Sequence, residues 1–251
     1  VCQLNTAGLE LHRDAVLEGL QQVLEPAWLL LRNDSSQRAL ERLPSLVESL
    51  LGEPPSPLEI TENDTLNRAM VAELAAGARV LDAYCYLGGF GLLAAKAGAR
   101  HVTLLDSSAS ALELATAAAA RNGLSEVVTA QQSDVFEAFE AYAKQKRQFE
   151  VVVIDPPAFA RSKKDLPAAL RGYRKLARLA ARAVAPGGFL LANSCSHTVD
   201  AASFLQETSR GVQEAGRNAR ILRATGASPD HPTHPHLPES AYLKALLLHL
   251  D

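Results

Sequence analysis

From residue 64 onward the chain alternates short apolar segments with helical ones. Four of the apolar runs carry or end in an aspartate, at 78–84, 101–106, 126–134 and 149–157. A fifth run opens at the turn Pro186-Gly-Gly188, and ARILRAT and AYLKALLLHL complete the set near the C-terminus. Helices are predicted between them, for example at about 64–76 and 166–184. This alternation predicts a parallel α/β sheet whose ligands bind beyond the carboxyl ends of the strands.

The first sixty residues follow a different pattern. Apolar residues recur at helical spacing over 8–24, which predicts an amphipathic helix, and AWLLLR predicts a short strand. The stretch GEPPSP at 52–57 is the most proline-rich of the chain and indicates a boundary. We therefore expect a small N-terminal α/β segment over 1–60 and a larger α/β domain over 61–251.

The composition limits the class of protein. A chain of 251 residues that is 47% hydrophobic and has a net charge of −3 is expected to be a soluble globular protein, not a general polycation. No apolar run reaches the roughly 20 residues that span a bilayer, so no membrane is expected. The opening VCQLNTAGLELHRD lacks the pattern of a signal peptide, and a first residue other than Met predicts that further residues precede it.

The cysteines and histidines argue against a structural metal. Cys2, Cys85 and Cys195 are an odd number without a close pair, which is atypical of a disulfide framework or a zinc site and suits a reducing cytosol. A cytoplasmic location is therefore predicted. In HPTHPH (231–236) the prolines interrupt helical spacing and no acid or cysteine accompanies the histidines, so we predict a loop and no metal.

A glycine-rich turn follows the first of these strands, in LDAYCYLGGFG. Glycine permits backbone to approach a ligand closely, although the strict G-x-G-x-x-G spacing of dinucleotide sites is absent. Asp106, about twenty residues on, can accept from both ribose hydroxyls, and Asp134 can accept from an adenine amino group with Phe136 against the ring. The acids at three strand ends could hold a single adenosine, and no second nucleotide-binding half is evident. This favours S-adenosylmethionine over NAD. The alternative for each acid is a helix N-cap. The predicted cofactor contacts are Asp82, Tyr84, Gly88, Gly89, Phe90, Asp106, Ser107, Asp134 and Val135.

The fourth of these strands ends in the turn Asp155-Pro-Pro-Ala-Phe159. Two prolines hold the backbone in one geometry, so the carboxylate and the proline carbonyls project in set directions. This arrangement suits an amino group on a planar base, with the aromatic ring packed on its face, and a rigid surface turn is the alternative. The predicted substrate contacts are Pro156, Pro157, Phe159, Arg161, Lys163 and Lys164.

Basic residues concentrate just after this turn. Arg174, Arg178 and Arg182 recur at helical spacing, and the single acid Asp165 lies among them. In a chain of net negative charge such a cluster can contact phosphates, while an ordinary solvated helix face remains the alternative. The cluster consists of Arg161, Lys163, Lys164, Arg171, Arg174, Lys175, Arg178 and Arg182.

The order of the motifs LDAYCYLGGFG, LLDSS, RNGL, DVFEAF, DPPAF, PGG and NSCS resembles that of class I S-adenosylmethionine-dependent methyltransferases. More narrowly, it is similar to the PUA-containing methyltransferases that act on cytosine C5 of 23S ribosomal RNA. DHP at 230–232, PESAYLK at 238–244 and LRNDSSQRALERL at 31–43 extend the likeness over essentially the whole chain. The resemblance implies a Rossmann-like sheet of seven strands, the last antiparallel, in a catalytic domain over 61–251.

Two features of that family are missing from this sequence. A PUA domain is expected before Val1. A glycine-rich GQKTG segment, with its aromatic and DQR continuation, is expected between Asn63 and Asp64, where ITEN runs straight into DTLNRA. Lids over cofactor sites are often mobile, so we favour a flexible segment omitted from the sequence over a true deletion, which would weaken cofactor binding.

Cys195 follows the fifth strand in NSCSH, and C5 methylation explains a cysteine there. Carbon 5 of a pyrimidine has no lone pair, so a thiolate must first add to carbon 6. Cys195 is the predicted nucleophile, with a small packed residue as the alternative, and Asp155 is the predicted acid that holds and protonates the base. For His197 a solvated loop histidine is favoured, and a helper to the thiol is the alternative. Cys85 is expected to pack in the core.

The predicted partner is 23S ribosomal RNA, whose target base would be flipped into the site. The oligomeric state stays open, with a homodimer as one possibility. A methyltransferase acting on a purine nitrogen or amine is the nearest alternative, because related enzymes share the DPP turn. A non-catalytic RNA-binding protein with the same fold is the second.

Overall fold

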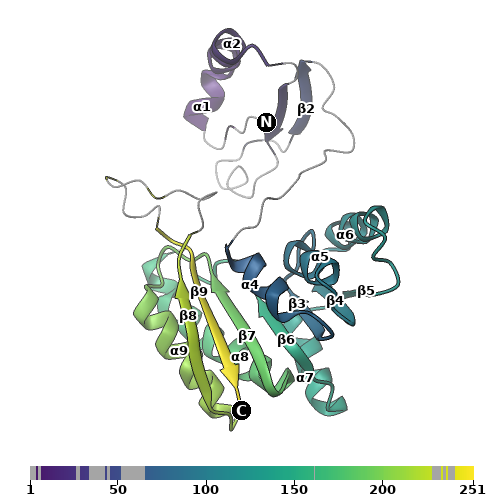
Figure 1. The fold of residues 1–251 in the computed structure, drawn as a ribbon. Coiled ribbons are helices and arrows are strands. Elements are labelled where there is room, and N and C mark those ends of the chain that lie inside the picture. Colours follow the sequence, from purple (N-terminus) through teal and green to yellow (C-terminus); the bar gives the residue numbers. More distant parts are fainter. Residues whose placement is uncertain are drawn as a thin grey trace. The chain divides into compact units, whose positions relative to one another are not determined.

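The computed structural model describes residues 4, 7–26, 29–33, 43, 46–51, 66–160, 162–227, 233, 236 and 241–251. The chain divides into two compact units, Val1–Glu62 and Asn63–Asp251, which are described separately below. Figure 1 shows the elements of both.

The first unit combines two helices with an antiparallel strand pair. Instead of one helix over 8–24, the chain forms α1 (Ala7–Leu11) and α2 (Arg13–Leu24), separated by a turn at His12. The strands are β1 (Leu29–Asn33), which confirms the predicted strand, and β2 (Leu46–Leu51). Leu31 is fully buried, and an ion pair of 2.9 Å joins Arg13 to Glu48, so the helices and the hairpin share one small core.

The second unit is built on a seven-stranded sheet of order β5-β4-β3-β6-β7-β9-β8. Strand β9 is antiparallel to both of its neighbours, β7 and β8, and the other pairs are parallel. This confirms the predicted Rossmann-like sheet with an antiparallel last strand. The strands are β3 (Arg79–Ala83), β4 (His101–Asp106), β5 (Val128–Gln132), β6 (Phe149–Ile154), β7 (Val184–Ser194), β8 (Ala219–Thr225) and β9 (Lys244–Leu250).

Strand β7 begins earlier than its sequence predicts. The turn residues Pro186, Gly187 and Gly188 lie within it, at a register shift against β6. A Cβ atom on Gly188 would lie 2.8 Å from the backbone oxygen of Glu150, so glycine is required for the close approach of the two strands.

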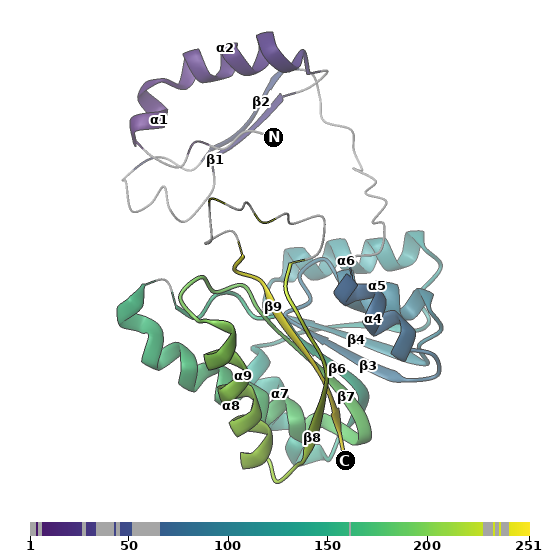
Figure 2. The same cartoon turned by 60° about the vertical axis from the view of Figure 1, so that its left-hand side comes forward.

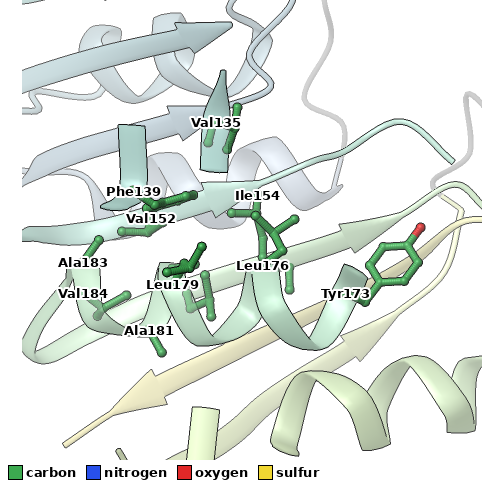
Figure 3. Close-up of a cluster of buried hydrophobic side chains, with 14 of the residues drawn as sticks. Val135, Phe139, Val152, Ile154, Tyr173, Leu176, Leu179, Ala181, Ala183 and Val184 are labelled. Atoms are coloured by element: carbon green, nitrogen blue, oxygen red, sulfur yellow. The ribbon is translucent and has the colours of Figure 1, made fainter. Parts of the chain in front are cut away.

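Helices cover both faces of the sheet (Figures 1 and 2). One face carries α4 (Leu66–Leu74), α5 (Gly89–Lys96) and α6 (Ala109–Arg121), and the other carries α7 (Val135–Gln145), α8 (Leu166–Ala183) and α9 (Ala201–Glu214). Successive strand residues point to opposite faces, so Val151 and Val153 enter the core under α4 to α6 and Val152 enters the core under α7 to α9. Figure 3 shows the second core.

Candidate active site

The residues predicted to carry chemistry gather at one edge of the sheet. Asp82 lies near the end of β3, Asp106 ends β4, and Asp155 and Cys195 immediately follow β6 and β7. These four strands are parallel, so their carboxyl ends meet at the same edge. The antiparallel strand β9 begins at this edge, because Lys244 is paired with Ser194.

The loop between β3 and α5 is held by the two acids beside it. Asp82 accepts a hydrogen bond of 2.8 Å from the backbone N–H of Gly91, and Asp106 accepts one of 2.9 Å from that of Tyr86. The loop contains left-handed residues at Tyr84 (φ 62°), Tyr86 (φ 49°) and Gly88 (φ 80°). The turn therefore contains strained backbone of the kind that is found at functional sites.

Asp82 is a completely buried carboxyl group. Its burial raises its pKa to about 7, against the lowering effects of the Gly91 N–H and of the Arg68 guanidinium. The Oδ1 atom has no hydrogen-bond partner among the described residues. A buried acceptor of this kind is costly, and a donor group on a bound ligand would satisfy it.

Asp82 predicts a specific pH dependence of stability. Its pKa is raised in the folded protein, so the folded state binds the proton more tightly than the unfolded chain does, and this group's contribution falls as the pH rises from about 4 to about 7. We expect the free energy of unfolding of the wild type, relative to Asp82→Asn, to fall by on the order of 2–4 kcal/mol over this range. Urea denaturation of both proteins from pH 4.5 to 7.5 measures it. A constant difference between them would contradict the prediction.

Asp134 acts as a helix cap in this structure. It is the N-cap of α7, where its Oδ1 atom accepts from the backbone N–H of Glu137 at 3.1 Å. The helix-cap alternative therefore holds for this acid, and its role toward adenine stays a prediction. Next to it, Val135 is only 2% exposed, so its side chain belongs to the core and a ligand could meet only its backbone. Ser107, beyond β4, is exposed.

The proline turn after β6 faces the end of β7. The Sγ atom of Cys195 lies 3.8 Å from the backbone oxygen of Pro156, and the thiol is half-buried. Phe159 packs against Tyr173 of α8 with ring centroids 4.7 Å apart. The Ser194 hydroxyl donates to the Tyr173 hydroxyl oxygen at 2.9 Å, so the aromatic cluster supports both sides of the site.

Burial at this point raises the pKa of both reactive groups. Asp155 as a whole residue is exposed to solvent. Protein atoms are nevertheless packed around its carboxyl group, and this burial raises its pKa to about 6, whereas the charge of Arg68 acts to lower it. Burial raises the pKa of the Cys195 thiol, and the negative charge of Asp155 adds to this. The backbone amides of Cys195 and Ala158 and the charge of Lys244 oppose the increase.

Arg68 is a site residue that sequence reasoning missed. It lies on α4, and its guanidinium carbon is 5.7 Å from the centroid of the Phe90 ring. A Cβ atom on Gly89 would lie 2.8 Å from that carbon, so the guanidinium rests directly on the glycine turn. The helix was predicted, but no local pattern distinguishes this arginine from those on other helices.

Comparison with known proteins identifies the family. A family model described as S-adenosylmethionine-dependent methyltransferase matches residues 57–249. The chain belongs to this family. It is 35% identical to the ribosomal RNA large subunit methyltransferase I of Aeromonas hydrophila, over 99% of this chain and 68% of that protein. The protein of the same name from Shewanella amazonensis is also 35% identical, over 98% of this chain and 68% of its own length.

Solved structures show the same methyltransferase fold. A putative methyltransferase from Streptococcus mutans has a TM-score of 0.79 at 21% identity, over 98% of this chain and 68% of that one. A putative methyltransferase complexed with SAH has a TM-score of 0.77 at 20% identity, with the same coverage of both chains. At this level of identity the likeness concerns the fold alone.

The cofactor of this methyltransferase is S-adenosylmethionine, and its residues fit that molecule. The unpaired Oδ1 atom of Asp82 offers a buried acceptor, and Asp106 ends the neighbouring strand beside the same loop. Gly91 has no space for a side chain, because its Cβ atom would lie 2.9 Å from Cγ1 of Val102. Glycine at this position is therefore required for the close packing of α5 against β4.

The predicted basic cluster does not form one solvated face. Arg174 is bound to α9 by ion pairs of 2.5 Å to Glu207 and 3.7 Å to Glu214, so it stabilises the contact between α8 and α9. Arg178 is half-buried, whereas Arg182 is exposed. Arg161 and the side chain of Lys163 lie outside the described residues. Lys164, Arg171 and Lys175 are exposed.

The remaining expectations concern metals and membranes. Four residues of the HPTHPH stretch lie outside the described part of the chain. Among the residues that the structure describes, no group of three or more His, Cys, Asp or Glu side chains is arranged to hold a metal ion. Within the same described ranges, none of the helices combines the length and apolar character needed to cross a bilayer.

Proposed function

We propose that this methyltransferase forms 5-methylcytosine in 23S ribosomal RNA through a covalent adduct with Cys195. The observation that carries the proposal is the position of the Cys195 thiol, 3.8 Å from the Pro156 oxygen in the turn that presents Asp155. A methyltransferase acting on a nitrogen needs no thiol, whereas one acting on C5 of a pyrimidine does. The relatives at 35% identity, named for ribosomal RNA of the large subunit, support the choice of RNA.

In the proposed reaction the Cys195 thiolate forms a bond to C6 of the cytosine. Asp155 lies across the site, where it holds the base and donates a proton to N3, so that the electron pair of the C5–C6 double bond is free to attack from C5. S-adenosylmethionine supplies the methyl group that C5 receives. A base then removes the C5 proton, the C6–S bond breaks to restore the thiolate, and N3 returns its proton to Asp155.

The electrostatics of the site suit these roles. Because the pKa of Asp155 is raised to about 6, a useful fraction of this carboxyl group carries a proton near neutral pH. Cys195 is only half-buried, which suits a nucleophile that must contact an incoming base. A reducing cytoplasm would maintain the thiol.

The other proposed contacts surround this pair. Pro156, Pro157 and Phe159 would hold the flipped base, and Lys164, with Arg161 and Lys163, would meet the RNA backbone. Asp82, Asp106 and the backbone of the turn would hold the cofactor, with further contacts from Tyr84, Gly88, Gly89, Phe90, Ser107, Asp134 and Val135. Arg68 joins this set, because its charge acts on both Asp82 and Asp155.

A mechanism-based trap tests the proposal. With 23S RNA transcribed with 5-fluorocytidine in place of cytidine, C5 has no proton to lose, so the adduct cannot be released after methyl transfer. We expect a protein–RNA complex that survives denaturing electrophoresis and forms only when S-adenosylmethionine is present. The same RNA made with cytidine is the control.

The trap also separates the alternatives. If a methyl group is found on a purine and no adduct forms, the purine methyltransferase is correct. If calorimetry shows no binding of S-adenosylmethionine, the non-catalytic alternative is correct. Mass mapping of ribosomal RNA from cells with and without the gene then identifies the modified nucleotide.

A further inference from the structure

Lys244 lies beside the candidate nucleophile, although it is far from it in the sequence. It is the first residue of β9 and is paired with Ser194, the residue before Cys195. Its ammonium group is half-buried at the edge of the sheet where the catalytic groups gather. The register of two antiparallel strands therefore places a cation next to the cysteine.

The ammonium group of Lys244 is held by backbone carbonyls on both sides of the site. Its Nζ atom donates to the oxygen of Ser196 and to that of Tyr242, at 2.7 Å each. The ring of Tyr242 stacks on His197, with centroids 4.3 Å apart. The lysine thus joins the segment that contains Cys195 to the segment that leads into β9.

We propose that Lys244 is a positioning residue for the cysteine chemistry: it fixes the backbone around Cys195 and provides the positive charge that stabilises its thiolate. This inference rests on the proposed function, since it concerns the thiol assigned there as nucleophile. The hydrogen-bond acceptors of Lys244 are two neutral backbone carbonyls. In the described part of the chain no carboxylate forms an ion pair with it, so its positive charge can act on the sulfur atom of Cys195.

The surrounding charges explain why the thiol needs a cation. Burial raises the pKa of Cys195, and the negative charge of Asp155, from the end of β6, raises it further. Tyr173, from α8, also interacts with the thiol, and Asp200, at the start of α9, interacts with Lys244. His197 is engaged in the stack with Tyr242. Of these neighbours, Lys244 is the basic group whose charge favours the thiolate.

The ionisation of Cys195 can be measured without RNA. We would follow alkylation by iodoacetamide as a function of pH on the full chain, with mass spectrometry to separate Cys195 from Cys2 and Cys85. Lys244→Gln keeps a hydrogen-bond donor but loses the charge. In this variant we expect the midpoint of the alkylation rate against pH to move to higher pH, and the alkylation rate of Cys195 at pH 7.5 to fall about three- to fivefold. In Lys244→Arg, which keeps the charge, the midpoint should stay near that of the wild type.

The comparison of the two variants decides the matter. An unchanged midpoint in folded Lys244→Gln, or a midpoint in Lys244→Arg that is as high as in the glutamine variant, would overturn the inference. If Lys244→Gln fails to fold, Lys244→Met, which also removes the charge, replaces it, and an unchanged midpoint in that variant likewise overturns the inference. For methylation, kcat should fall while the KM for S-adenosylmethionine stays constant.

Failure of this inference can be distinguished from failure of the proposed function. If a protein without the Cys195 thiol still methylates RNA, Cys195 is not the nucleophile, whatever effect Lys244 has on the thiol. An unaltered thiol midpoint in Lys244→Gln, together with loss of methylation when Cys195 is removed, would refute only the role of Lys244.

Discussion

Replacement of Cys195 by alanine is expected to abolish RNA methylation while binding of S-adenosylmethionine is retained. Loss of a covalent nucleophile removes the whole route to the adduct, so we expect the rate to fall by about 10³-fold or more. The thiol is half-buried and its neighbours Ser194 and Ser196 are small, so the fold should tolerate the change. Transfer of a labelled methyl group to 23S RNA measures the rate, and calorimetry measures cofactor binding.

The matched control for this variant is Cys85→Ala. Cys85 is the other described cysteine; it is buried in the core under α4 to α6 and its pKa is raised strongly by that burial, so it is unsuited to act as a nucleophile. This variant should methylate RNA within a few-fold of the wild-type rate. Activity that persists in Cys195→Ala would instead support the purine alternative, which needs no thiol.

The second large effect is expected for Asp155→Asn. Asparagine has nearly the same shape but cannot donate a proton to the base, and loss of general acid catalysis typically lowers a rate by about 10²–10⁴-fold. We expect a loss in that range, in kcat more than in the KM for the cofactor. Glu113→Gln, which alters an exposed carboxylate on α6, is the control and should have no effect.

The pH profile gives a sharper test of Asp155. Its protonated form is lost as the pH rises through about 6, whereas the Cys195 thiolate increases until the pH reaches the raised pKa of the thiol. Between these two values the product of both fractions is constant, so the wild-type kcat/KM should be nearly flat with pH. In Asp155→Asn only the thiolate limb remains, so the residual rate should rise about tenfold per pH unit. Parallel profiles for the two proteins would exclude Asp155 as the acid.

Much of the fold was predictable because its signals are local. Most strands of the sheet are short apolar runs, and the acids at or after their ends are read directly from the sequence. The boundaries were less certain: β7 includes the Pro186–Gly188 turn, and the helix expected over 8–24 is divided at His12. These details depend on strand register and on packing within the small unit, which are not encoded in a single window of residues.

The sequence predicted candidate residues for the site, but it did not predict their burial or their hydrogen-bond partners. Asp82, Asp106 and Asp134 are similar in the sequence, each an aspartate at or just after a strand. In the structure Asp82 is fully buried with an unpaired oxygen, Asp106 holds the Tyr86 amide, and Asp134 caps α7. The basic residues likewise separate only in space, since Arg174 is bound to Glu207 on the next helix.

The sequence by itself predicted the succession of strands and helices along the chain, the sheet edge expected to bind ligands and the candidate nucleophilic thiol, because these predictions follow from local hydrophobic periodicity and from the chemistry of single residues. Only the tertiary structure decided which charges act on one another. Arg68 and Lys244 lie far along the chain from Asp155 and Cys195, and they meet them because β9 runs antiparallel and α4 packs over the glycine turn. Electrostatic energy depends on distance and burial in space, and neither quantity is a property of sequence separation.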